Sequence, residues 1–248
     1  MKKIGILDSG IGGLSLLNEI LSQNFLAEYY YISDNENMPY GNKSQDFMLK
    51  RIRVLVQKLL DKNVEAIIIA CNTATAETID KLRVEFDLPF FGIEPYINYL
   101  NHSHDENLAL ILTEATYNSK RFQLLTQKLD SNNKVKIFPL KNLALTIEKL
   151  KEVPFSEIEK DVYKELSFIK KLKLNSLILG CTHYPLISSY IEKEFNIKTV
   201  DPAYNVILHI KNSLKLESTH KPIKKFYYNQ NASDHWNYIS IKYFSFFN

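Results

Sequence analysis

The sequence has few glycines, prolines and cysteines, and neither sign of charge dominates it. Seven Gly and eight Pro among 248 residues disfavour an architecture dominated by loops. Two cysteines exclude a disulfide framework and a zinc site made of four Cys ligands. A net charge of +3 is too small to predict nucleic acid or a membrane surface as the partner. With 45% hydrophobic and 24% charged residues, the composition is that of a globular protein.

Long hydrophobic runs are also missing from the sequence. No apolar stretch approaches the roughly 18 residues of a membrane span. The apolar run at residues 4–7 is too short for the core of a secretory signal peptide. We therefore expect a cytoplasmic protein whose thiols stay reduced, which leaves Cys71 and Cys181 available for chemistry.

Short β-branched runs alternate with longer amphipathic stretches along most of the chain, which is typical of parallel strands joined by crossover helices. The fold class expected is α/β, with mostly parallel sheets flanked by helices. The strands expected are 4–7, 29–32, 66–70, 90–92, 108–112, 135–138, 176–179 and 198–200. The helices expected are 14–21, 47–60, 78–86, 119–129, 155–172, 186–195 and 206–214. The aromatic-rich stretch 226–247 gives no strong local pattern.

A weak internal repeat predicts two similar lobes. The run Ile67-Ile68-Ile69-Ala70-Cys71-Asn72-Thr73 resembles Leu177-Ile178-Leu179-Gly180-Cys181-Thr182-His183. Asp8 precedes Cys71 by 63 positions, and Thr113 precedes Cys181 by 68. We expect one lobe of residues 1–96 with 206–248, and a second lobe of residues 97–205. Because ligands of open α/β sheets bind beyond the carboxyl ends of the strands, the two thiols are expected to face one cleft between the lobes.

The glycine-rich segment after the first expected strand suggests either an anion site or an ordinary turn. Asp8-Ser9-Gly10-Ile11-Gly12-Gly13 joins a strand to a helix, where glycines permit a tight turn and expose N–H groups. It is neither the dinucleotide fingerprint nor a Walker loop.

In Cys71-Asn72-Thr73-Ala74-Thr75, with the next helix expected to begin near Ala76 or Thr78, free N–H groups favour a thiolate. A buried structural cysteine is the alternative, and the repeat favours function.

The second cysteine has a histidine two positions later, in Cys181-Thr182-His183-Tyr184-Pro185. His183 is expected to hydrogen-bond either the thiol or a substrate. Metal ligation is a poorer interpretation, because these two side chains supply only two ligands. Thr116, in Thr113-Glu114-Ala115-Thr116, is a candidate hydrogen-bond donor to a carboxylate. Pro39-Tyr40-Gly41 lies in a polar loop after Asp34, where Tyr40 can close over a ligand.

In this order and spacing the motifs resemble those of the glutamate racemases, within the cofactor-independent aspartate/glutamate racemase superfamily. The segments that carry the resemblance are Ile4 through Ser15, Asp34 through Pro39-Tyr40-Gly41, Ala70 through Thr75, and Leu179 through Leu186. The resemblance implies interconversion of L- and D-glutamate by two bases, without pyridoxal phosphate or metal. It also implies a supply of D-glutamate for peptidoglycan and a homodimer.

The resemblance also implies roles for individual residues. Cys71 and Cys181 match the two acid/base thiols, with Cys71 deprotonating D-glutamate and Cys181 L-glutamate. Asp8 and His183 match residues that assist those thiols. The positions that match amino-acid-binding residues are Ser9, Pro39, Tyr40, Gly41, Asn72, Thr73, Thr75, Thr116 and Thr182.

Other functions stay open at this point. A sister activity on aspartate or a hydantoin is one, although relatives acting on aspartate usually have Thr-Glu where this chain has Thr182-His183. A non-catalytic carboxylate sensor is a second. A hydrolase with Cys181 as nucleophile and His183 as base is a third, but it lacks an orienting third residue and leaves Cys71 unexplained.

Overall fold

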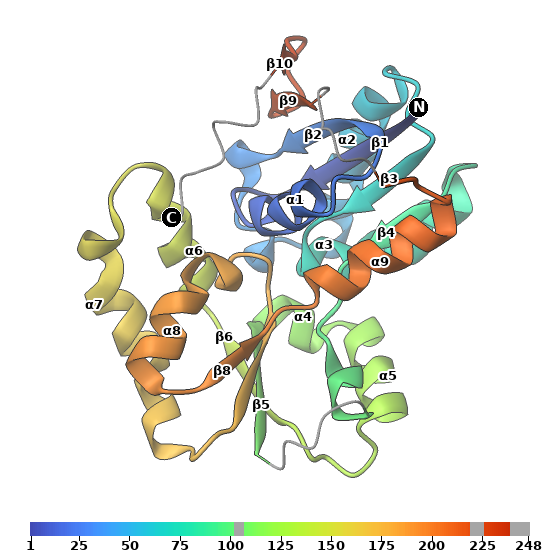
Figure 1. The fold of residues 1–248 in the computed structure, drawn as a ribbon. Helices are drawn as coiled ribbons and strands as arrows, with labels where there is room; N and C mark the ends of the chain where they lie inside the picture. The colour runs from blue at the N-terminus through green and yellow to red at the C-terminus, as the bar shows by residue number, and fades with distance from the viewer. Residues whose placement is uncertain (102–106, 219–225, 239–248) are drawn as a thin grey trace.

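The computed structural model describes residues 1–101, 107–218 and 226–238. It contains two sheets, one above the other in Figure 1. The first sheet has the strand order β10-β9-β2-β1-β3-β4, in which β10 alone is antiparallel to its neighbour. Its strands are β1 (Lys2–Asp8), β2 (Ala27–Ser33), β3 (Ala66–Ile69), β4 (Phe90–Gly92), β9 (Phe226–Gln230) and β10 (Asn237–Tyr238).

The second sheet is entirely parallel and has the order β6-β5-β7-β8. Its strands are β5 (Leu108–Thr113), β6 (Lys136–Leu140), β7 (Ser176–Gly180) and β8 (Lys198–Val200). This order repeats β2-β1-β3-β4 of the first sheet, so β3 and β7 hold equivalent places. The α/β prediction is confirmed, and all eight expected strands are present, six of them with shifted ends.

Helices cover both faces of each sheet, and each face has its own apolar core. On the first sheet, α1 (Gly13–Ser22) and α9 (Ala203–Leu214) pack on one face, and α2 (Gln45–Leu60) and α3 (Asn72–Glu85) on the other. On the second sheet, α6 (Leu143–Glu148), α7 (Phe155–Leu166) and α8 (Ser188–Phe195) share one face, whereas α5 (Lys120–Leu129) packs on the opposite face. A short α4 (Glu114–Asn118) follows β5 directly. Short 3-10 turns complete the chain at Asn35–Asn37, Tyr40–Asn42, Ile97–Asn101, Lys149–Lys151, Ser167–Lys171 and Tyr184–Ile187.

Helix α3 begins earlier than the sequence indicates. We expected a start near Ala76 or Thr78, but the helix begins at Asn72. The Cys71 thiol takes the place of the usual capping oxygen, with Ala74 N donating to Sγ at 3.5 Å. Cys71 is thereby fixed at the N-terminus of a 14-residue helix.

The C-terminal stretch that gave no pattern contains two strands. Parallel pairing with β2 runs from Tyr29–Phe226 to Ser33–Gln230, so β9 extends the first sheet. The side chain of Phe226 is buried against Tyr31, with ring centroids 6.4 Å apart. The remainder of the aromatic tail, residues 239–248, lies outside the described residues.

None of the helices in the described part of the chain has both the length and the apolar character needed to cross a membrane.

Truncating Phe226 tests whether β9 is part of the fold. Phe226→Ala removes a ring that is 1% exposed, so we expect the free energy of unfolding to fall by about 3–5 kcal/mol. Urea denaturation followed by circular dichroism measures it. Val84→Ala, at an apolar position that is 88% exposed, should change it by less than about 0.5 kcal/mol. Equal effects of the two substitutions would show that β9 does not pack as described.

Candidate functional site

The carboxyl ends of both sheets meet at one cavity, which both cysteines line. Cys71 follows β3 and Cys181 follows β7, the equivalent strands of the two sheets. The cavity has a volume of about 20 Å³, room for about one water molecule. It is lined by Ser9, Pro39, Tyr40, Gly41, Asn42, Cys71, Thr73, Thr113, Glu114, Lys141, Ala144, Leu145, Cys181 and His183.

The surroundings of Cys71 favour its protonated form. The thiol is 6% exposed, and Ser9 Oγ lies 3.6 Å from its Sγ. Burial, and then the nearby Asp8 carboxylate, raise the pKa of Cys71 to about 12, although the Ala74 amide and the Ser9 hydroxyl oppose the shift. Cys71 is therefore a thiol near neutral pH.

Asp8 lies beneath the glycine loop rather than in the cavity wall. Its Oδ2 accepts hydrogen bonds from Gly10 N at 3.0 Å and Gly13 N at 2.9 Å. Its Oδ1 is buried without a hydrogen-bond partner among the described residues. Burial raises the pKa of Asp8 to about 6, against the attraction of His183 and the two amides. The carboxyl can therefore exchange a proton near neutral pH.

The second thiol belongs to a buried chain of ionisable groups. His183 Nδ1 lies 3.8 Å from Cys181 Sγ, and His183 Nε2 lies 2.6 Å from Glu148 Oε2. Burial alone would lower the pKa of His183, but hydrogen bonds to Cys181 and Glu148 hold it well above the ordinary value. The pKa of Glu148 stays below its ordinary value despite burial, because His183 stabilises the carboxylate. His183 and Glu148 thus form an imidazolium–carboxylate pair.

Sequence reasoning missed Glu148, the partner of His183. It lies 35 positions before His183, at the end of the six-residue helix α6, and no local motif marks it. The same Oε2 accepts from Ile11 N of the glycine loop at 3.2 Å. Lys151 Nζ lies 3.6 Å from the other carboxylate oxygen. Glu148 therefore joins the loop after β1 to the loop after β7.

Two glycines permit this close approach of the loops. A Cβ on Gly12 would lie 2.4 Å from His183 Nδ1, and one on Gly10 would lie 2.4 Å from Glu148 Oε2. Ser15 Oγ, just beyond the loop, donates to the Thr182 carbonyl at 3.0 Å. The glycine loop is thus more than a turn, because its lack of side chains makes room for the His183–Glu148 pair.

A threonine cluster connects the two halves of the fold, one built on the first sheet and the other on the second. Thr73 Oγ1, on α3, lies 2.9 Å from Thr113 Oγ1 and 3.2 Å from Thr116 Oγ1, and the last two oxygens are 2.9 Å apart. Thr73 and Thr113 line the cavity, whereas Thr116 is fully buried behind them. Hydroxyl donors from both halves are thereby brought together.

Tyr40 is held in the cavity wall by an ion pair whose carboxylate is buried. Its OH donates to Asp34 Oδ2 at 2.6 Å, and the Arg51 guanidinium binds the same carboxylate with Nη2 2.7 Å from Oδ1. Arg51 Nη2 also donates to the Asn231 carbonyl at 2.9 Å. The C-terminal stretch therefore helps to fix the Pro39-Tyr40-Gly41 wall.

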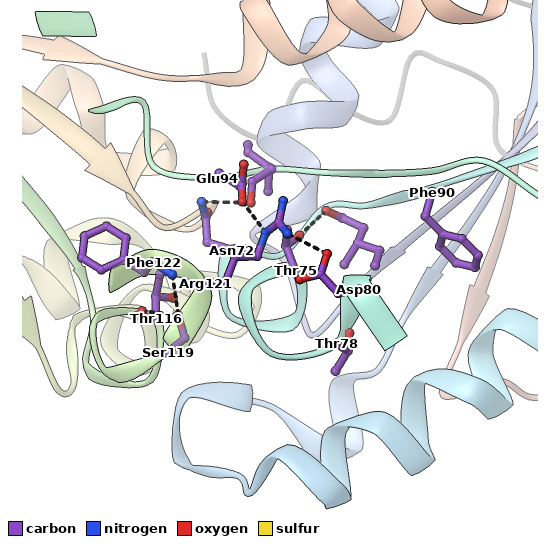
Figure 2. Close-up of polar contacts among 12 residues, drawn as sticks. Asn72, Thr75, Thr78, Asp80, Phe90, Glu94, Thr116, Ser119, Arg121 and Phe122 are labelled. Atoms are coloured by element: carbon purple, nitrogen blue, oxygen red, sulfur yellow. Dashed lines mark hydrogen bonds and ion pairs between the residues drawn. The ribbon is translucent and has the colours of Figure 1, made fainter. Parts of the chain in front are cut away.

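Asn72 and Thr75, also selected from the sequence, do not line the cavity. Asn72 Nδ2 donates to the Ile93 carbonyl at 3.4 Å (Figure 2). Thr75 Oγ1 donates to the Ile69 carbonyl at 3.2 Å and lines a different cavity, of about 320 Å³. In the same view Arg121 bridges Glu94 and Asp80, at 2.5 and 2.7 Å.

Of the remaining residues selected from the sequence, Ser9, Pro39 and Gly41 line the cavity. Thr182 is buried, and its Oγ1 has no hydrogen-bond partner among the described residues. No group of three or more His, Cys, Asp or Glu suited to a metal ion occurs within residues 1–101, 107–218 and 226–238.

Known proteins are similar to this chain in sequence and fold. A family model described as Asp/Glu/hydantoin racemase matches residues 17–206. Glutamate racemase of Leptospira borgpetersenii serovar Hardjo-bovis (strain JB197) is 36% identical over 216 residues, covering 86% of this chain and 83% of that protein. A glutamate racemase isoform of Bacillus anthracis matches with a TM-score of 0.77 at 28% identity, covering 92% of this chain and 87% of that one. Escherichia coli glutamate racemase, in complex with L-glutamate and the activator UDP-MurNAc-Ala, gives 0.77 at 25% identity, covering 89% and 85%.

The role of Glu148 in holding the charge of His183 can be measured directly. Glu148→Gln should lower the pKa of His183, because a neutral amide no longer stabilises the imidazolium while burial still opposes it. NMR titration of the imidazole nitrogens reports this pKa. Glu165→Gln is the matched control, since Glu165 is a half-buried glutamate that accepts from Thr146 instead. An unchanged His183 pKa in Glu148→Gln would refute the pairing.

Proposed function

The chain belongs to the Asp/Glu/hydantoin racemase family, and from this membership we propose that it is a glutamate racemase in which Cys71 and Cys181 are the two acid/base groups. The observation that carries the proposal is the single cavity lined by one thiol from each half of a repeated fold. The glutamate racemases among its relatives, at 34–38% identity, support glutamate as the substrate.

Inverting a carbon centre requires one group to take a proton from one face while another gives a proton to the opposite face. Thiols after β3 and β7 can do this if the substrate Cα lies between them. Cys181 then takes the Cα proton of L-glutamate and Cys71 supplies the new one; the reverse reaction exchanges these roles. With Cys71 held as a thiol by burial and by Asp8, the site is ready to protonate the carbanion formed from L-glutamate.

The assisting groups differ between the two thiols. On the Cys71 side, Asp8 has a pKa of about 6 and Ser9 Oγ is 3.6 Å from the sulfur, so a carboxyl and a hydroxyl are near the proton. On the Cys181 side, protonated His183 can donate to the thiolate through Nδ1, with Glu148 keeping the imidazolium charged. We propose Asp8 and His183 as the assisting residues and Glu148 as the positioning residue of His183.

In a reaction without pyridoxal phosphate, no cofactor takes up the negative charge of the carbanion. Fixed dipoles of the site must therefore stabilise that charge. We propose that Ser9, Thr73, Thr116 and Thr182 with the N-terminus of α3 surround the α-carboxylate and ammonium groups, and that Pro39, Tyr40 and Gly41 bound the rest of the substrate. Asn72 and Thr75 belong to the same set by resemblance. Because they hydrogen-bond to the Ile93 and Ile69 carbonyls, we propose that they position the N-terminus of α3.

The volume of the cavity adds a requirement for movement. Glutamate has ten non-hydrogen atoms and does not fit a space of about 20 Å³, so the cavity must enlarge to admit it, and we propose that it does so by separation of the halves. Closure afterwards excludes water and strengthens every electrostatic contact in the site. We propose the halves to be residues 1–96 with 206–248 and residues 97–205.

The cellular role follows from the same proposal. D-glutamate made by the reaction would serve peptidoglycan synthesis, and the protein would act in the cytoplasm, where its two free thiols stay reduced. We also propose a homodimer, by the resemblance of the motifs.

Racemisation and its dependence on both thiols can be measured by polarimetry. The wild-type protein should bring either pure glutamate enantiomer to an equal mixture, because enantiomers have equal free energies. Cys71→Ala and Cys181→Ala should each lower kcat by roughly 10²–10⁴-fold, the usual contribution of acid/base catalysis. Unchanged melting temperatures show that the variants fold. Normal turnover by either variant would contradict the two-thiol mechanism.

Deuterium labelling distinguishes two bases from one. In heavy water, L-glutamate should give D-glutamate carrying deuterium at Cα while the remaining L-glutamate stays unlabelled at early times, because each thiol serves one face. Chiral chromatography with mass spectrometry separates the pools. Faster labelling of unreacted substrate than inversion would indicate a single base. Binding by calorimetry without any change in rotation would favour a carboxylate sensor.

A further inference from the structure

The cavity wall contains a lysine to which neither the sequence motifs nor the mechanism above gives a role. Lys141 comes directly after β6, at the carboxyl end of the second sheet. In register, Thr113 of β5 pairs with Leu140 of β6, so Lys141 and Glu114 are the first residues beyond the paired strands. Lys141 is exposed, which places it at the mouth of the cavity instead of its base.

The cation of the cavity wall that remains available to a ligand is Lys141. The other positive group in the wall is His183, whose charge is matched by Glu148 at 2.6 Å. Among the described residues Lys141 forms no ion pair, even with Glu114 in the same wall. A carboxylate that leaves water needs an opposite charge or several donors, and Lys141 offers that charge at the rim.

The walls of the mouth fit a short acidic side chain. The lining includes Pro39, Tyr40 and Gly41 from the segment after β2, and Lys141, the buried Ala144 and the 41% exposed Leu145 from the segment after β6. A dicarboxylic amino acid with its Cα between the thiols can place its distal carboxylate between these two segments. Ala144 and Leu145 are apolar, so the ammonium of Lys141 is the group of this wall that distinguishes a carboxylate from an amide.

We propose that Lys141 is a specificity-determining residue, whose Nζ pairs with the distal carboxylate of the substrate and selects it over the uncharged amide. The inference rests on the proposed racemase function, because it takes a dicarboxylic amino acid as the substrate. Lys141 acts on binding and not on proton transfer, so its replacement should change KM rather than kcat. The effect falls with ionic strength, since the pair is at the rim.

Replacement of the charge tests the proposal. Lys141→Gln should raise KM for both glutamate enantiomers about tenfold with kcat within about twofold, and Lys141→Arg should recover most of the loss. Because the two enantiomers have equal free energies, kcat/KM must fall equally in both directions. Raising the salt concentration should narrow the difference between wild type and Lys141→Gln. Lys136→Gln, at the opposite end of β6 and also exposed, is the matched control and should match wild type.

Selectivity is measured by calorimetry, which does not depend on turnover. The wild-type protein should bind L-glutamate more tightly than L-glutamine, and Lys141→Gln should reduce that ratio about tenfold. An unchanged ratio, an unchanged KM, or a loss confined to kcat would each overturn the role of Lys141. A wild-type protein that binds L-glutamate selectively through Lys141 but racemises neither enantiomer would refute the proposed function while leaving this inference standing.

Discussion

The Glu148 carboxylate is the contact on which the geometry of the site depends. One of its oxygens accepts from His183 of the second half and from Ile11 of the first half, at 2.6 and 3.2 Å. A carboxylate that is 2% exposed is costly unless such partners hold its charge. The glycine loop must therefore come close enough to donate an N–H group, and this distance leaves no room for a Cβ at Gly10 or Gly12. Three features depend on this one buried ion pair: the glycines of the loop, the contact between the two halves, and the charge of His183.

The two halves repeat a topology without repeating its chemistry. Equivalent strands β3 and β7 both end at a cysteine, yet Cys71 lies near a carboxyl and a hydroxyl, whereas Cys181 lies near an imidazolium. This asymmetry follows from the surroundings: β1 ends at Asp8, whereas the equivalent β5 ends at Thr113. A reaction that treats the two faces of a carbon alike in free energy can use different partners on each face, provided that both thiols reach the same atom.

Contacts far from the thiols determine the walls of the cavity. The Asp34–Arg51 pair holds the Tyr40 hydroxyl, and Arg51 also binds the carbonyl of Asn231 near the C-terminus. The C-terminal strand β9 pairs with β2, whose last residue precedes Asp34. The C-terminal stretch is thus linked to the Pro39-Tyr40-Gly41 wall of the cavity through the Asp34–Arg51 pair.

Local sequence determined strands β1 to β8, most of the helices, and the positions of both cysteines at strand ends, because alternation and turn residues act over a few neighbours. It also predicted the repeat and the family. Tertiary structure alone decided the partner of His183, the start of α3 at Asn72, the pairing of β9 with β2, and the orientation of Asn72 and Thr75 away from the cavity. Each of these depends on groups brought together by folding, such as Ile11 and Glu148, which are 137 positions apart. The residues next to each partner in the sequence do not predict such a contact, because its energy arises only when both partners are buried together.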